Sequence, residues 1–222
     1  MVPVMPPLPL FDPIRFLTEI GYTLIMVLMC LLVFLKTKEV YELTKHRGIY
    51  YFRSTFLFFG LAYLFRLLFD FIQVFGPVFD LYVHRSVIGP LSMLFTGYFS
   101  TIALLCLIYS TVWKKFSGKE FIITANLIAL VIAFAAVVSP VVFIITQVFL
   151  LVIAIVLSCF LRKKSRFPKI FVLYFLLFLF WALSIILVLP KRVLPFELRV
   201  IMEIISVALF AVLYYRVAKW TK

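Results

Sequence analysis

The chain has few of the residues that usually build metal and catalytic sites. Its 222 residues include only two histidines, three cysteines and nine acidic residues. His46 and His84 are predicted to lie on opposite sides of a membrane, so a histidine-built metal site has no partners. Cys30, Cys106 and Cys159 lie inside apolar runs, where we expect small core residues rather than a disulfide framework.

The motifs of several enzyme classes are also absent. The sequence has no Gly-rich nucleotide loop, no HExxH pair, no Gly-x-Ser-x-Gly elbow and no cluster of metal-binding aspartates. No lysine lies within the long apolar runs, and a retinal Schiff base needs one there. We therefore expect a protein that is not an enzyme and that binds no cofactor.

Apolar residues, by contrast, dominate the composition. They make up 66% of the chain, charged residues make up 14%, and the mean hydropathy is +1.20. Such a composition indicates an all-α protein of the bilayer, and we expect a multi-pass protein of the cell membrane. The net charge of +13 comes from short basic clusters between apolar runs, which does not favour a nucleic acid partner.

Seven apolar segments are long enough to span a bilayer, which needs roughly 20 residues of helix. They run from 13 to 36, 50 to 75, 87 to 112, 121 to 138, 141 to 161, 170 to 189 and 196 to 217. The chain thus divides into a Pro-rich arm outside the cytoplasm (1–12), a bundle of seven transmembrane helices (13–217) and a short cytoplasmic tail (218–222). The loop after the first span can continue as a helix, with Lys38 and Glu42 four residues apart.

Basic residues in the loops predict the orientation. One side carries Lys36, Lys38, Lys45, Arg47, Arg53, Lys114, Lys115, Lys119, Arg162, Lys163, Lys164, Arg166, Lys169, Arg216, Lys219 and Lys222, and the other only Arg15, Arg85, Lys191, Arg192 and Arg199. The positive-inside rule then places the N terminus outside and the C terminus in the cytoplasm. The cluster Arg162, Lys163, Lys164, Arg166 and Lys169 is a candidate contact for anionic lipid at the cytoplasmic face, although its role in topology explains it more simply.

The second span carries a polar stripe made of Tyr63, Arg66, Asp70 and Gln73, whose spacing of three or four residues places them on one helix face. Arg66 lies about 15 Å below the outer end of the span. An arginine at that depth is expected to face the bundle interior and to find a carboxylate. Glu203 in the seventh span lies at a similar depth, about 10 Å from its outer end.

We therefore predict an outward-facing ligand site around Arg66, formed by Arg66, Asp70, Glu203, Tyr63, Gln73, Glu19 and Tyr22. A buried ionic clasp that binds nothing explains the same residues equally well. Asn126 and Gln147, inside the fourth and fifth spans, are expected to hydrogen-bond across helices.

Three functions agree with these observations. The first, which we favour, is a non-enzymatic receptor or sensor module. It would need a separate protein partner for output, because the cytoplasmic loops and the tail are short. The second is a small transporter, since spans one to three and five to seven run in the same direction and can form parallel three-helix repeats. The third is a structural subunit that packs through the alanines of the fourth span, at 125, 129, 133 and 136.

Overall fold

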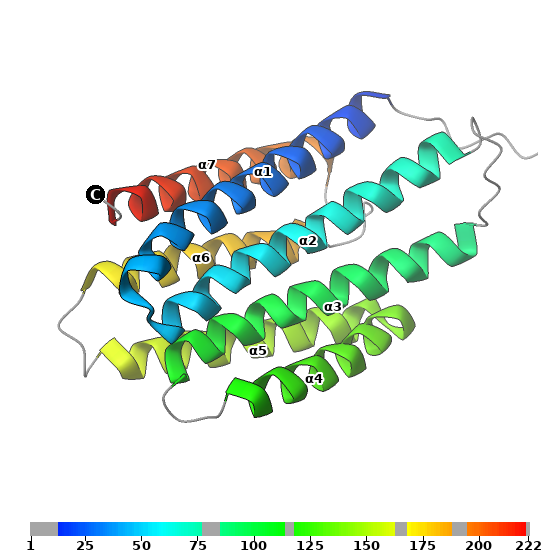
Figure 1. The fold of residues 1–222 in the computed structure, drawn as a ribbon. Coiled ribbons are helices and arrows are strands. Elements are labelled where there is room, and N and C mark those ends of the chain that lie inside the picture. Colours follow the sequence, from blue (N-terminus) through cyan, green and yellow to red (C-terminus); the bar gives the residue numbers. More distant parts are fainter. Residues whose placement is uncertain (1–12, 77–84, 114–117, 163–167, 188–194, 221–222) are drawn as a thin grey trace, which may run out of the picture.

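A computed structural model describes residues 13–76, 85–113, 118–162, 168–187 and 195–220. These residues form seven helices and no strands, which confirms the predicted all-α fold (Figure 1). The helices are α1 (Pro13–Thr44), α2 (Arg47–Phe75), α3 (Arg85–Val112), α4 (Gly118–Val138), α5 (Pro140–Arg162), α6 (Pro168–Leu187) and α7 (Phe196–Trp220). The predicted tail begins within α7, because that helix continues past residue 217 to Trp220.

Helix α1 is longer than a single span requires, as the sequence allowed. Its last turns carry ion pairs along the helix surface, Lys36 to Glu39 at 3.0 Å and Lys38 to Glu42 at 3.6 Å. The helix ends where Lys45 adopts a left-handed backbone with φ of 51°, and α2 begins two residues later. The basic connection between α1 and α2 is therefore a tight corner rather than a loose loop.

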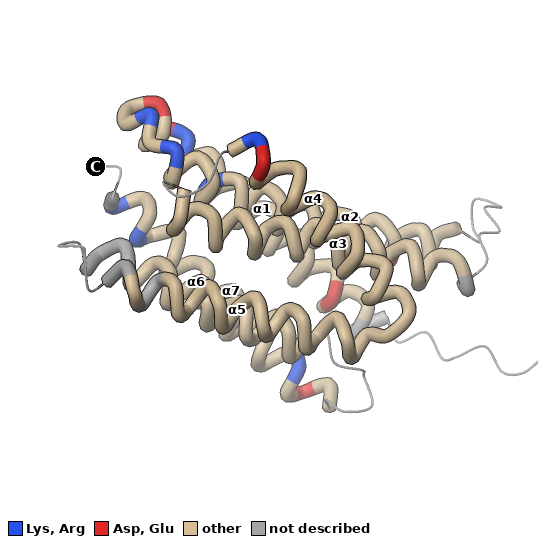
Figure 2. The backbone as a smooth tube through the Cα atoms, turned by 90° about the horizontal axis from the view of Figure 1, so that it is seen from below, with Lys and Arg blue, Asp and Glu red and all other residues tan. Residues whose placement is uncertain are grey.

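Five helices, α1 to α5, are long and apolar enough to cross a membrane. The chain is therefore a multi-pass membrane protein, as predicted. Most of the described lysine and arginine residues gather at the end of the bundle where the C terminus lies (Figure 2). The described parts of the basic clusters from which we predict the orientation thus gather at one end of the bundle. Which end faces the cytoplasm stays a prediction.

Six of the helices form a closed ring, which we call the six-helix ring. Contacts join α1 to α2, α2 to α3, α3 to α5, α5 to α6, α6 to α7 and α7 back to α1. Helix α4 is not part of this ring, because it packs outside it against α3 and α5 (Figure 1).

The alanines of α4 explain its place. Ala125, Ala129, Ala133 and Ala136 are all buried. Opposite them, Gly97 of α3 lies so close that an added Cβ would stand 3.4 Å from the Cβ of Ala136. Small residues on both helices permit this close approach. The alanine stripe is thus filled within the chain itself, which leaves it unavailable to a separate subunit.

Aromatic rings pack against one another in the interior of the ring, among aliphatic side chains. Phe56 of α2, Phe180 of α6 and Phe210 of α7 are almost fully buried, and their rings meet edge to face. Phe59 continues this packing toward the middle of α2, with its ring centroid 4.6 Å from that of Trp181. Edge-to-face pairs of this kind add to the burial of apolar area. These rings form an aromatic cluster shared by α2, α6 and α7.

Candidate functional site

Arg199 of α7 is the centre of the buried charges. Its guanidinium lies 3.4 Å from Glu203, one turn along the same helix, and 3.7 Å from Glu19 of α1. Only about a tenth of the Arg199 and Glu203 side chains is exposed. The arginine thus joins α1 to α7 through two carboxylates, and it compensates the buried charge of Glu203.

A chain of hydroxyl groups lies beside these charges and connects four helices. Ser206 of α7 lies 3.2 Å from the hydroxyl of Tyr22, which lies 3.2 Å from that of Tyr63. Tyr63 in turn lies 3.4 Å from Ser184 of α6. Because Ser184 donates its only hydrogen to the carbonyl of Phe180, Tyr63 must donate to Ser184, and Tyr22 must donate to Tyr63. The same reasoning makes Ser206 the donor to Tyr22, so the chain runs in one direction from α7 to α6.

Arg66 does not pair with Glu203, because no ion pair between these two described residues lies within 4.0 Å. Its Nε lies 4.0 Å from Asp70 on the next turn of α2. The Arg66 side chain is 27% exposed, and no other ion pair to it lies within 4.0 Å among the described residues. The carboxylate expected from another helix is therefore replaced by one from α2 itself.

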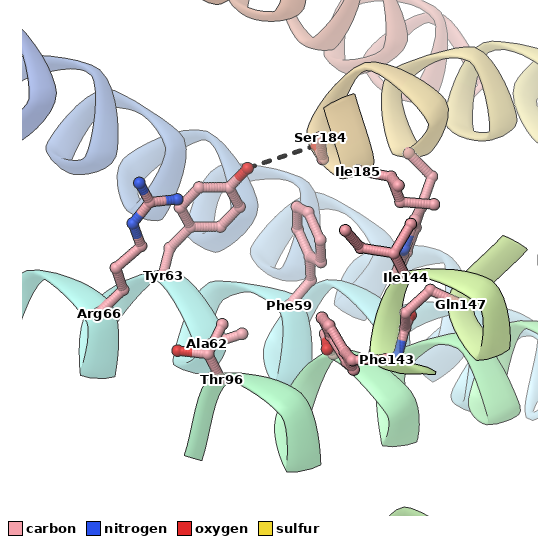
Figure 3. A pocket seen from close by; sticks show the side chains of 12 residues that line it. Phe59, Ala62, Tyr63, Arg66, Thr96, Phe143, Ile144, Gln147, Ser184 and Ile185 are labelled. Carbon is pink, nitrogen blue, oxygen red and sulfur yellow. Dashed lines mark hydrogen bonds between the residues drawn. The ribbon is translucent and has the colours of Figure 1, made fainter. Parts of the chain in front are cut away.

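Arg66 instead lines a cavity inside the ring (Figure 3). The cavity lies between α2, α3, α5 and α6 and offers about 60 Å³ to water-sized groups, which is room for several water molecules. Its walls are Phe59, Ala62, Tyr63, Arg66, Thr96, Ser100, Phe143, Ile144, Gln147, Trp181, Ser184 and Ile185. Apolar side chains supply most of this lining, so the few polar groups set its chemistry.

Two of these polar groups have no hydrogen-bond partner. They are Oγ1 of Thr96 and Oε1 of Gln147, and both atoms are buried. The orientation of the Gln147 amide follows from its neighbours, because Thr101 donates its hydrogen to the carbonyl of Gly97 and can only accept from Gln147 Nε2, at 2.9 Å. The amide oxygen is thereby left free. Unpaired buried polar atoms are uncommon and costly, so they mark a position where a partner fits.

The predicted site residues are thus divided between two neighbouring groups. Glu19 and Glu203 share Arg199, and Tyr22 and Tyr63 share the hydroxyl chain. Arg66 and Tyr63 line the cavity, with Asp70 beside Arg66. Gln73 is exposed on the outer turn of α2. The lipid candidates Lys163, Lys164 and Arg166 lie outside the described residues, as do the side chains of Arg162 and Lys169.

Sequence reasoning missed the part of the site that α3, α5 and α6 supply. Gln147 and Asn126 do bond across helices as predicted, Gln147 to Thr101 and Asn126 to Tyr98. The sequence gives no sign, however, that Gln147 keeps a free oxygen or that Thr96 is unpaired. The available signal was the one amide of a mostly apolar fifth span, which fits a structural bond as well as a site.

No group of three or more metal-binding side chains of His, Cys, Asp and Glu occurs in the described part of the chain. The polar groups of the cavity are a cation, hydroxyls and an amide oxygen. Such a set suits a small organic molecule with both a negative charge and a hydrogen-bond donor.

Comparison with other proteins gives one full-length relative. A protein of Archaeoglobus fulgidus, described as an uncharacterized protein, is 38% identical over 231 residues, which cover 99% of each chain. No protein-family model matches the chain. No solved structure matches it either. The chain therefore belongs to the family that this Archaeoglobus fulgidus protein represents.

Proposed function

We propose that this protein is a non-enzymatic membrane module of receptor or sensor type that binds a small molecule in the cavity beside Arg66. The observation that carries the proposal is the combination in one cavity of a guanidinium with two unpaired buried oxygens, on Thr96 and Gln147. A structural clasp needs no cavity, and its polar groups pair with one another.

The surroundings of the cavity support a signalling role. Tyr63 and Ser184 line the cavity and also belong to the hydroxyl chain that reaches α1 and α7. A ligand that displaces Tyr63 therefore alters bonds between four helices at once. Such a movement would pass from the cavity to the ends of α1 and α7, where a separate protein partner would receive it.

The test uses the full chain in lipid nanodiscs and a panel of small carboxylates. We expect at least one of them to raise the melting temperature of the protein, because a ligand that binds only the folded state stabilises it. The stabilisation should be lost in Arg66→Met and kept in Arg47→Met, which removes an exposed arginine from the other end of the same helix. Equal stabilisation of the two variants would count against the proposed site.

A small transporter is the second candidate, and the order of the helices favours it. Replacing α1, α2 and α3 by α5, α6 and α7 turns each contact of the six-helix ring into another contact of the same ring. Two parallel three-helix repeats related by a twofold axis would have this pattern. Against it stands the packing of Phe56, Phe180 and Phe210, which are almost fully buried and place apolar rings in the interior of the ring. Uptake of a bound carboxylate into proteoliposomes would favour the transporter.

A further inference from the structure

The cavity is elongated along the bundle, with different polar groups at its two ends. Figure 3 shows Arg66 and Thr96 at one end and Gln147 at the other. Gln147 bonds to Thr101, five residues beyond Thr96 on α3, which corresponds to about 7.5 Å along the helix. On α2 the lining extends from Arg66 to Phe59, or about 10 Å. The distance between the two polar ends is therefore similar to the length of a short hydrocarbon chain.

The side walls between these ends are apolar. Ala62, Phe143, Ile144 and Ile185 supply them, and Phe59 and Trp181 add apolar rings to the lining. The lining residues therefore form an elongated channel with apolar sides. Such a channel fits an unbranched chain better than a fused ring system.

Each polar end requires a different chemical group. The ion pair of Arg66 with Asp70 is formed at Nε, at 4.0 Å, so a carboxylate of the ligand can bind the two terminal guanidinium nitrogens. The free oxygen of Gln147 can only accept a hydrogen bond. Gln147 is buried, with only 2% of its surface exposed. The far end of the ligand must therefore donate a hydrogen.

We infer that the ligand is an unbranched carboxylate of medium length with a hydroxyl group at its far end, bound with the carboxylate on Arg66 and the hydroxyl on Gln147. This inference rests on the proposed function, because it names the ligand class of the same cavity. A site that accepts a hydrogen bond from a ligand discriminates strongly against an analogue without the donor, since the acceptor is then left buried and unpaired.

The experiment compares three probes by calorimetry on the full chain in nanodiscs: ω-hydroxyoctanoate, octanoate and ω-methoxyoctanoate. The wild-type protein should bind the hydroxy acid at least about tenfold more tightly than the other two. The methoxy compound matters because it keeps the oxygen and lacks the hydrogen, so it tests the donor without changing the protein. Equal binding of the three probes would overturn the inference while leaving the proposed function intact.

Gln147→Met provides the test on the protein side. This change keeps the length of the side chain, and Thr101 still donates to Gly97, so we expect the fold to persist. The preference for the hydroxy acid should disappear in Gln147→Met and remain in Asn126→Leu, which removes an amide from α4 outside the ring. A preference that survives in Gln147→Met would refute the role of this residue. Failure of all three probes to bind the wild-type protein would count against the carboxylate site itself.

Discussion

Removing Arg199 should destabilise the protein more than removing either of its carboxylate partners. In Arg199→Met, the Glu203 carboxylate loses its one ion-pair partner in the described structure, at 3.4 Å, while its side chain stays about nine-tenths buried. Glu19 loses less in this variant than Glu203, because it is more exposed and has a further interaction besides Arg199. The cost of the variant therefore falls mainly on Glu203.

The size of the effect follows from this difference. Breaking a buried ion pair by removing one partner costs about 3 to 5 kcal/mol, since the remaining charge is uncompensated. Glu203→Gln should cost only about 1 kcal/mol, because the amide oxygen can still accept from Arg199, which keeps Glu19. The double variant Arg199→Met with Glu203→Gln should be more stable than Arg199→Met alone, since it leaves no unpaired charge at Glu203.

The measurement is the free energy of unfolding by SDS titration from mixed micelles or bicelles. Arg216→Met is the matched control, because Arg216 is an exposed arginine on the same helix, and its effect should stay within about 0.5 kcal/mol. Two results would refute the reasoning. One is a loss below about 1 kcal/mol for Arg199→Met, and the other is a larger loss for Glu203→Gln than for Arg199→Met.

Three further changes test other parts of the structure. Tyr63→Phe removes the middle of the hydroxyl chain and leaves Tyr22 without its acceptor, so the same titration should show a loss of about 1 to 2 kcal/mol, and an unchanged stability would mean that the chain does not hold the helices. Gly97→Leu should cost about 1 to 3 kcal/mol, because the larger side chain separates α3 from α4. Gly97→Ala should cost much less, because its added Cβ meets its nearest atom at 3.4 Å. Equal costs for the two variants would contradict the close packing of these helices. In whole cells, an impermeant maleimide should label Glu197→Cys and should label Lys45→Cys only after lysis, and the reverse pattern would overturn the predicted orientation.

The sequence predicts the helices well because the features that define each helix lie within its own residues. The second span was expected to end before Gly76, and α2 does end at Phe75. The stripe at Ala125, Ala129, Ala133 and Ala136 was expected to permit a close helix approach, and α3 fills it. Apolar length and a row of small residues are local properties, so they can be recognised without knowledge of the neighbouring helices.

The partners across helices were harder to predict. The depths of Arg66 and Glu203 are similar, and this similarity suggested a pair. Depth does not say, however, which way a residue faces around the ring, and Arg199 on the same helix as Glu203 reaches its carboxylate first. Likewise, the free oxygen of Gln147 depends on the bond from Thr101 to Gly97 on another helix. Such features arise only when three or more segments are brought together.

The position of α4 has a consequence for the direction of the chain. This helix adds no wall to the six-helix ring, which closes by direct contact between α3 and α5. It does add one passage across the bundle, and that passage reverses the direction of every later helix. Without it, α5, α6 and α7 would run the opposite way, and the C-terminal end of α7 would leave the end of the bundle where α1 ends and α4 begins (Figure 1). Because α4 adds one crossing between them, the triplet α1, α2 and α3 and the triplet α5, α6 and α7 cross the membrane in the same directions.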